Sequence, residues 1–255
     1  MKKIVFITGA TSGIGKASAY KFATNNCNLI LTGRRKERLK KIKKDIEKKY
    51  GVRVKILKFD VRELVEVKSA INSLSDKWKG IDVLINNAGL AAGMDHIQDG
   101  NIENWERMID TNIKGLLYVS KMIMPLMIRN KRGHIINIGS IAGKEVYPKG
   151  NVYCATKHAV DALTKAMRID LLPHNIKVTQ IAPGAVETEF SIVRLGNKEA
   201  AKKVYDGYEP LHPQDIADVC YYATTLPKHV NINDLLIMPT AQANAVTFYK
   251  KQRDK

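Results

Sequence analysis

Short apolar runs alternate with longer amphipathic stretches along nearly the whole chain. Seven runs rich in Val, Ile and Leu have the pattern of buried strands: residues 2–7, 28–32, 52–57, 82–86, 134–139, 176–182 and 234–238. Six intervening stretches repeat apolar residues at helical spacing: about 14–26, 35–49, 62–78, 103–130, 153–172 and 214–225. This rhythm predicts a parallel sheet with helices on both faces, joined by right-handed crossovers.

Glycine and proline mark several of the predicted boundaries. Gly51 follows one helix, Pro173 ends another, and Pro213 suits the first position of a third. The long segment 184–212 is irregular or only briefly helical, and insertions of that length are more often lids than accidents. We therefore expect an α/β fold, a doubly wound Rossmann-like parallel sheet, with residues 1–255 in a single domain that carries this lid.

Composition supports an ordinary globular protein. Of 255 residues, 45% are hydrophobic and 26% are charged, and no apolar run reaches the roughly 18 residues that a membrane span needs. The three cysteines are widely spaced and form no CxxC pair, and the six histidines show no metal-ligand spacing. We expect a cytoplasmic protein with no membrane partner, no disulfide framework and no metal.

The charge balance raises the question of a polyanionic partner. Lys and Arg number 42 against 25 Asp and Glu, a formal net charge of +17. Residues 34–49 hold ten of the basic residues, but Leu39, Ile42 and Ile46 recur at helical spacing and place the lysines on a solvent face. No aromatic residues interleave with them. We expect no nucleic-acid partner, although a basic binding patch remains the alternative.

A glycine-rich turn follows the first predicted strand and opens a helix. Glycines there let the backbone approach a pyrophosphate, whose charge the helix N-terminus favours. A nucleoside-triphosphate loop is excluded because Ala10 and Ala17 stand where it needs Gly and Ser or Thr. The candidate cofactor-binding residues are Gly9, Thr11, Ser12, Gly13, Ile14 and Gly15.

The end of the second strand indicates which nicotinamide cofactor binds. NAD-binding folds place a carboxylate there for the ribose 2′-hydroxyl. This chain instead has Arg34 and Arg35, whose guanidinium groups suit a 2′-phosphate. The pattern favours NADP; the alternative is that both arginines only begin the basic helix.

Tyr153 and Lys157 form the most informative pair. Their spacing of four places both side chains on one helix face, and a nearby cation favours the phenolate of a tyrosine, which otherwise titrates near pH 10. Ser140 ends the fifth predicted strand, where its hydroxyl would reach a substrate oxygen. A hydrolase elbow is disfavoured because the spacing around Ser140 is not G-x-S-x-G.

Together these motifs resemble the short-chain dehydrogenase/reductase family over roughly residues 3–240. The matching motifs are the Thr8 to Gly15 turn, Asp60-Val61, Asn86-Asn87-Ala88-Gly89, Asn112, Ser140, Tyr153 with Lys157, and Pro183-Gly184. The resemblance implies a catalytic tetrad of Asn112, Ser140, Tyr153 and Lys157. It also implies that the cofactor meets Asp60, Val61, Asn87, Ala88, Gly89, Pro183, Gly184, Val186 and Thr188, together with Tyr153 and Lys157.

A narrower likeness lies in TGRRKERL, NNAGLAAGMD, GNVYCATK, PGAVETEFSIVR and LPKHVNINDLLIMPTAQ. These segments resemble the NADP-dependent 3-hydroxy acid dehydrogenases, which oxidise serine, allo-threonine and related acids. Cys154 and Leu195 depart mildly from that pattern, and so does the unusually basic helix after Arg35. The likeness implies a small hydroxy acid or oxo acid substrate and a homotetramer, with helices 103–130 and 153–172 as interfaces.

A carboxylate in the substrate needs a cationic or multi-donor partner. We expect Arg194, on the lid, to hold it, and Ser140 and Tyr153 to meet the hydroxyl; Lys144 or backbone donors are the alternative. Two other functions stay open. One is reduction of a 3-oxoacyl thioester or another carbonyl compound by a member of the same family, and the other is a basic scaffold on a relict dehydrogenase fold.

Overall fold

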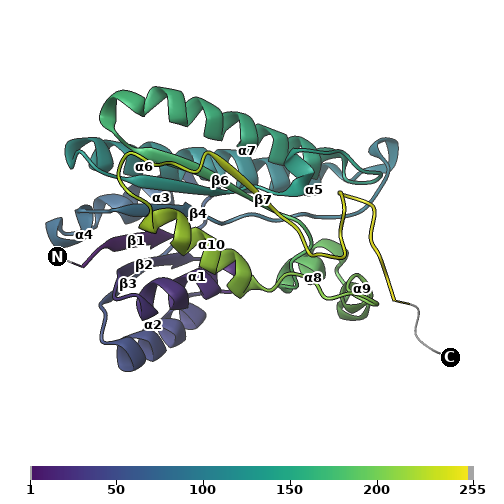
Figure 1. Cartoon of the computed structure of the whole chain (residues 1–255), viewed down its shortest axis with the longest axis horizontal. Coiled ribbons are helices and arrows are strands. Elements are labelled where there is room, and N and C mark those ends of the chain that lie inside the picture. Colours follow the sequence, from purple (N-terminus) through teal and green to yellow (C-terminus); the bar gives the residue numbers. More distant parts are fainter. Residues whose placement is uncertain (1, 252–255) are drawn as a thin grey trace.

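A computed structural model describes residues 2–251 and contains one seven-stranded parallel sheet (Figure 1). The strand order is β3-β2-β1-β4-β5-β6-β7. The strands are β1 (Ile4–Ile7), β2 (Asn28–Gly33), β3 (Val54–Lys58), β4 (Val83–Asn86), β5 (His134–Ile138), β6 (Lys177–Pro183) and β7 (Asp234–Ile237). All seven predicted strands are confirmed, and so is the doubly wound topology, whose order reverses between β1 and β4.

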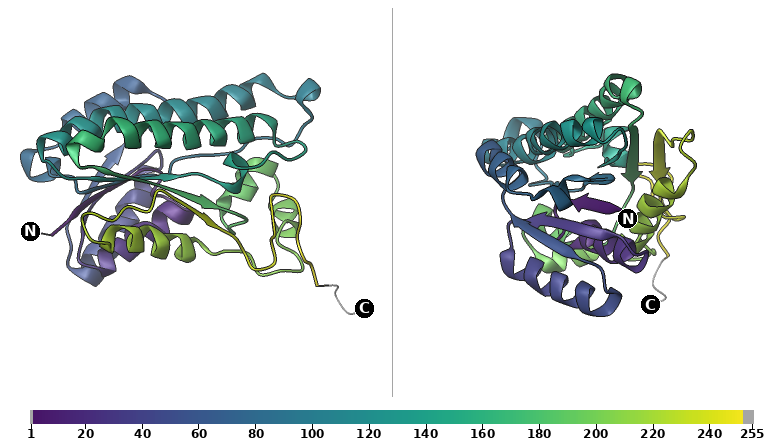
Figure 2. Two further views of the ribbon diagram at one scale, coloured as in Figure 1. Left: turned by 45° about the horizontal axis from the view of Figure 1, so that its top comes forward. Right: turned by 90° about the vertical axis from the view of Figure 1, so that its left-hand side faces the viewer.

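Helices cover both faces of the sheet, as the end-on view in Figure 2 shows. On one face lie α3 (Leu64–Asn72), α6 (Gly115–Arg129) and α7 (Asn151–Asp170); on the other lie α1 (Gly13–Thr24), α2 (Lys36–Tyr50) and α10 (Pro213–Thr225). The residues of strand β1 are all apolar because both of its faces are buried. Ile4 and Phe6 pack in the hydrophobic core beneath α3, α6 and α7, whereas Val5 and Ile7 pack in the core on the opposite face.

The basic helix α2 follows its predicted pattern. Leu39, Ile42 and Ile46 are buried in the core, and the helix ends at Gly51, which adopts a left-handed φ of 64°. Glycine is favoured there because other side chains rarely adopt that conformation.

The structure corrects one predicted helix. The stretch 62–78 is not continuous: α3 ends at Asn72, and a single turn, α4 (Asp76–Lys79), follows. The hydroxyl of Ser73 donates to the Ala70 carbonyl, and Ser75 is extended with ψ 158°. Serines compete with helical hydrogen bonding in this way, which ends the helix two turns early.

The stretch predicted as one helix over 103–130 is helical throughout but irregular. It comprises α5 (Ile102–Ile109), a π-helical turn η2 (Asp110–Lys114) and α6. Asn112 lies in that π-turn, a type of irregularity that is frequent at functional sites.

The insertion 184–212 holds two short helices, α8 (Glu189–Leu195) and α9 (Lys198–Lys203). Figure 1 shows both at one end of the sheet, with the C-terminal tail running past them. The tail contacts the insertion, since the Lys251 amide donates to the Gly207 carbonyl and the rings of Tyr208 and Phe248 lie 5.1 Å apart. Within residues 2–251, no helix is long and apolar enough to cross a membrane.

Candidate active site

The glycine turn packs tightly against the end of β4. A Cβ atom on Gly15 would lie 2.5 Å from the carbonyl oxygen of Gly9, which itself has a φ of +64°, so both positions require glycine. The Thr8 hydroxyl accepts hydrogen bonds from the amides of Asn87 and Ala88, each at 2.9 Å. Sequence-distant residues predicted to meet the cofactor therefore lie side by side at the carboxyl ends of β1 and β4.

Arg35 lies directly over this turn. Its guanidinium donates to the hydroxyls of Thr11 and Ser12, at 2.8 Å for the shortest bond to each. It also pairs with the Glu189 carboxylate at 2.8 Å, and Arg38 pairs with the other oxygen of that carboxylate at 2.7 Å. Hydrogen bonds and charge from both arginines outweigh the effect of burial, which raises the pKa, and hold the pKa of Glu189 below its usual value.

Arg34 points toward the end of β3 instead. It lies 3.6 Å from a carboxylate oxygen of Asp60, whose main partner is Arg62 at 2.7 Å. Val61 is buried and packs against Gly115. The two arginines predicted to act together thus have different partners in this structure.

Tyr153, Ser140 and Lys157 come together where β5 ends and α7 begins. Tyr153 is the third residue of α7 and is buried. Ser140 follows β5 and accepts a hydrogen bond from the Ala142 amide at 3.1 Å, and its hydroxyl is among the groups that lower the pKa of Tyr153. The ammonium group of Lys157 lies 6.0 Å from the Tyr153 ring centre and donates to the Ile138 carbonyl at 2.9 Å.

Burial shifts the pKa values of Tyr153 and Lys157 in opposite directions. Burial raises the pKa of Tyr153, as does Tyr147, while the hydrogen bond from Ser140 and the charge of Arg194 lower it. Burial alone lowers the pKa of Lys157 to about 8. Strongly perturbed groups that adjoin one another are typical of catalytic sites.

Asn112 is fully engaged by protein groups. Its amide donates to the Leu90 carbonyl at 2.8 Å and to the Thr156 hydroxyl at 3.0 Å, and its oxygen accepts from the Leu90 amide at 2.9 Å. A Cβ on Gly89 would lie 3.2 Å from the Asn112 oxygen and 3.7 Å from the Lys157 nitrogen. Gly89 therefore leaves the space in which Asn112 and Lys157 approach each other.

Arg194, near the end of α8, lies over the phenol of Tyr153. Its guanidinium carbon is 5.6 Å from that ring centre and 5.4 Å from the ring of Tyr147, whose hydroxyl accepts a hydrogen bond from Arg194 Nη1 at 3.0 Å. Its Nε is buried and has no hydrogen-bond partner among the described residues. A partly buried guanidinium with an unpaired donor is suited to an anionic ligand.

Lys144, unlike Arg194, is already paired with acidic side chains. Its ammonium group contacts the carboxylates of Asp161, at 2.5 Å, and Asp234. Two carboxylates already neutralise this cation, so the structure does not support the alternative in which Lys144 holds a substrate acid.

The remaining predicted residues border the same site from the lid side. Thr188 caps α8, and its methyl group would lie 3.2 Å from a Cβ on Gly13. Gly184 follows β6, and Val186 forms a bridge with Leu211. Among residues 2–251, no group of three or more His, Cys, Asp or Glu side chains is arranged to hold a metal ion.

Two residues of this site were missed by the sequence analysis. Glu189, which pairs with Arg35, directly follows a predicted cofactor residue, but no spacing relates it to β2. Tyr147, which positions Arg194, lies in a loop without periodicity. Both contacts depend on how the insertion 184–212 packs against distant parts of the chain, which local sequence patterns do not encode.

Comparisons with known proteins give a consistent picture. Residues 3–197 match the family model of the short chain dehydrogenases. The chain is 44% identical over 252 residues to an NADP-dependent 3-hydroxy acid dehydrogenase of Schizosaccharomyces pombe, covering 98% of this chain and 97% of that protein. It is also 44% identical over 245 residues to sulfoacetaldehyde reductase 2 of Chromohalobacter salexigens, covering 95% and 96%.

A solved structure shares the whole fold. The closed form of a serine dehydrogenase complexed with NADP+ superposes with a TM-score of 0.90 at 41% identity, covering 98% of this chain and 100% of the other.

Proposed function

This chain belongs to the short-chain dehydrogenase family, and we propose that it is an NADP-dependent oxidoreductase that acts on small 3-hydroxy acids such as serine, allo-threonine or 3-hydroxybutyrate, or on the matching 3-oxo acids. The observation that carries the substrate proposal is Arg194, whose buried Nε has no hydrogen-bond partner within residues 2–251 and whose guanidinium lies over the Tyr153 ring. An acid bound there would present its hydroxyl to the phenol.

The residues around the glycine turn fit NADP. The turn before α1 and the first turn of that helix contain Gly9, Gly13 and Gly15, which leave the backbone without side chains at these positions. Among the described residues, the side chain of Ser12 does not cap the helix. Arg35 supplies donors beside Thr11 and Ser12, and Arg34 approaches from the β3 side. We propose that these arginines bind the 2′-phosphate, and that Asp60, Asn87, Ala88 and Thr188 border the rest of the cofactor.

The chemical roles follow from the order of the groups around Tyr153. Ser140 would hold the substrate hydroxyl while the Tyr153 phenolate removes its proton, and Arg194 would hold the carboxylate. Bound NADP supplies the acceptor for the hydride that leaves the carbinol carbon. Lys157, charged below about pH 8, stabilises the phenolate. Asn112 orders the π-turn beside Lys157 and would help connect the proton to solvent.

The names of both curated relatives support an anionic substrate. One is named for hydroxy acids and the other for sulfoacetaldehyde, which carries a sulfonate. A sulfonate and a carboxylate offer the same kind of acceptor to a guanidinium. Reduction of sulfoacetaldehyde is therefore the second candidate function, and it uses the same residues.

Steady-state turnover tests the proposal. The panel comprises serine, allo-threonine, 3-hydroxybutyrate and isethionate, each with oxidised NADP or NAD, and a 3-oxoacyl thioester with the reduced form of either cofactor. Turnover is measured by the absorbance of the reduced nicotinamide. We expect the highest kcat/KM with one of the hydroxy acids and NADP. Preference for the thioester would support the alternative reductase, and no turnover at all, together with tight salt-resistant DNA or RNA binding, would support the basic scaffold.

Three further features belong to the proposal. The insertion 184–212 acts as a lid on one catalytic domain, 1–255. The enzyme is a homotetramer in which α5, α6 and α7 form interfaces, which light scattering would test. Its three cysteines, Cys27, Cys154 and Cys220, are buried and free, which suits a reducing cytoplasm.

A further inference from the structure

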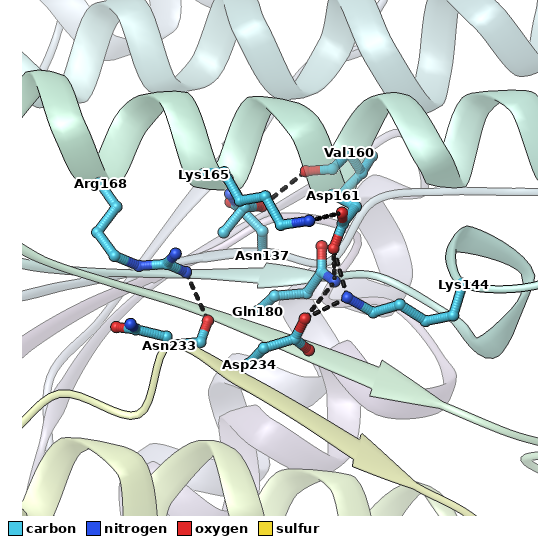
Figure 3. Close-up of polar contacts among 10 residues, drawn as sticks. Asn137, Lys144, Val160, Asp161, Lys165, Arg168, Gln180, Asn233 and Asp234 are labelled. Atoms are coloured by element: carbon cyan, nitrogen blue, oxygen red, sulfur yellow. Dashed lines mark hydrogen bonds and ion pairs between the residues drawn. The ribbon is translucent and has the colours of Figure 1, made fainter.

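A network of charged and polar side chains joins α7, β6 and β7 to the loop at Lys144, four residues after Ser140 (Figure 3). We name it the Lys144 clamp; its members are Lys144, Asp161, Gln180 and Asp234. Lys144 lies just after the short helix η3 (Ile141–Gly143), Asp161 on α7, Gln180 on β6 and Asp234 at the start of β7. These residues come from four separate parts of the chain, so their contacts fix those parts relative to one another.

The contacts of the clamp are direct. The Lys144 ammonium binds one oxygen of Asp161 at 2.5 Å and one of Asp234. The Gln180 amide donates to the same Asp161 oxygen at 2.8 Å. The other Asp161 oxygen binds Lys165 at 2.6 Å, a pair that lies within α7 and joins no second element.

Two of these groups, Asp161 and Lys144, are largely removed from water. The side chains of Asp161 and Lys144 are 14% and 25% exposed. Burial alone would raise the pKa of Asp161, but hydrogen bonds from Lys144, Lys165 and Gln180 hold it at about 2. Ion pairs desolvated to this degree add little net stability compared with apolar packing, and their best-attested benefit is a defined geometry.

The clamp encloses the backbone on both sides of Ser140. Before it, a Cβ on Gly139 would lie 3.0 Å from Cδ of Gln180. After it, a Cβ on Gly143 would lie 2.6 Å from the carbonyl oxygen of Lys157, so the loop is pressed against α7. Lys144 is the next residue, and its ion pair with Asp161 closes this contact.

Asp161 lies on the same helix as the proposed base. It follows Lys157 by four residues, one helical turn, and Tyr153 by eight. We propose that the Lys144 clamp is a positioning device that fixes the loop carrying Ser140 relative to helix α7, which carries Tyr153. This inference rests on the proposed roles of Ser140 and Tyr153.

The consequence should appear in the ionisation of Tyr153. The groups that face its phenol are Ser140 from the loop, Arg194 from α8, Tyr147, and Cys154 and Lys157 from its own helix. A looser loop would weaken the contribution of Ser140, which favours the phenolate. Misplacement by an ångström also costs catalysis directly, by about 100-fold at most.

The test compares Lys144→Met and Lys144→Arg with the control Lys165→Met, which removes the Asp161 contact that joins no second element. The pKa of Tyr153 is measured in each NADP complex by absorbance of the phenolate, taking the difference from the same protein with Tyr153→Phe. We expect Lys144→Met to raise this pKa and to lower kcat about tenfold with KM for NADP unchanged. Lys144→Arg and Lys165→Met should stay near wild type.

Asp234→Asn offers a milder change if Lys144→Met folds poorly, because it removes one of the two carboxylates from a side chain that is 35% exposed. Asp234→Asn should also raise the pKa of Tyr153, but by less than Lys144→Met. An unchanged tyrosine pKa and kcat, with only a lower Tm, would overturn the inference. The titration needs no substrate, so a wild-type enzyme that turns over no hydroxy acid contradicts the proposed function while leaving this result readable.

Discussion

Two arginines stand at opposite ends of the site, and their surroundings differ. Arg35, at the cofactor end, is 42% exposed and already binds a carboxylate, that of Glu189. Arg194, at the substrate end, lies between the rings of Tyr147 and Tyr153, and its Nε has no partner among the described residues. One cation is matched by an anion of the protein, whereas the other is surrounded by neutral groups.

This difference indicates how each end meets a ligand. At the proposed cofactor end, a 2′-phosphate would have to compete with Glu189 for Arg35, which would offset part of the attraction. At the proposed substrate end, an acid would meet a partly buried cation with no carboxylate beside its buried Nε among the described residues, where an electrostatic contact would be stronger. Helix α8 joins the two ends, because Glu189 is its first residue and Arg194 its last but one.

The largest effect should come from substitution of Tyr153, the proposed general base. Tyr153→Phe keeps the ring and loses only the ionisable hydroxyl, so kcat should fall by about 100-fold or more while NADPH still binds. Fluorescence titration of NADPH supplies the control. Retention of more than about a tenth of the activity would show that Tyr153 is not the general base.

The second largest effect is expected for substitution of Arg194, at the proposed substrate end. Arg194→Leu should lower kcat/KM for 3-hydroxybutyrate by about 100-fold, because a charge-assisted bidentate contact is lost. A neutral secondary alcohol of similar size should lose far less. Equal losses on charged and neutral substrates would mean that the lid is damaged and that Arg194 does not bind the acid.

The cofactor end should respond more weakly because its arginines are exposed. Replacing Arg34 and Arg35 together with Ala should weaken NADP about 30-fold and NAD only slightly, since the 2′-phosphate is the only group that differs. Isothermal titration with both cofactors measures this. Parallel losses would point to a folding defect.

The smallest effect concerns Glu189. Glu189→Gln removes the carboxylate that competes for Arg35, so NADP should bind about threefold more tightly at low salt and the gain should fade at high salt. NAD affinity is the control. Weaker NADP binding would instead identify Glu189 as part of the closed complex.

The sequence predicts features that arise from local patterns and misses contacts between distant segments. All seven strands and the glycine turn follow from buried apolar runs and from positions such as Gly15, where no Cβ fits. The break between α3 and α4 was missed because serines ended a helix whose apolar pattern continued. The pairing of Glu189 with Arg35 and of Tyr147 with Arg194 was missed because the lid makes both contacts in three dimensions.

The insertion 184–212 carries Arg194, through which the proposed enzyme would select an acid. The most direct measurement is kcat/KM with NADP for 3-hydroxybutyrate and for its methyl ester, which keeps the carbinol and loses the charge. The account predicts that the acid is preferred by about 100-fold or more. An ester used as well as the acid would contradict it, and would favour a reductase of neutral 3-oxoacyl compounds.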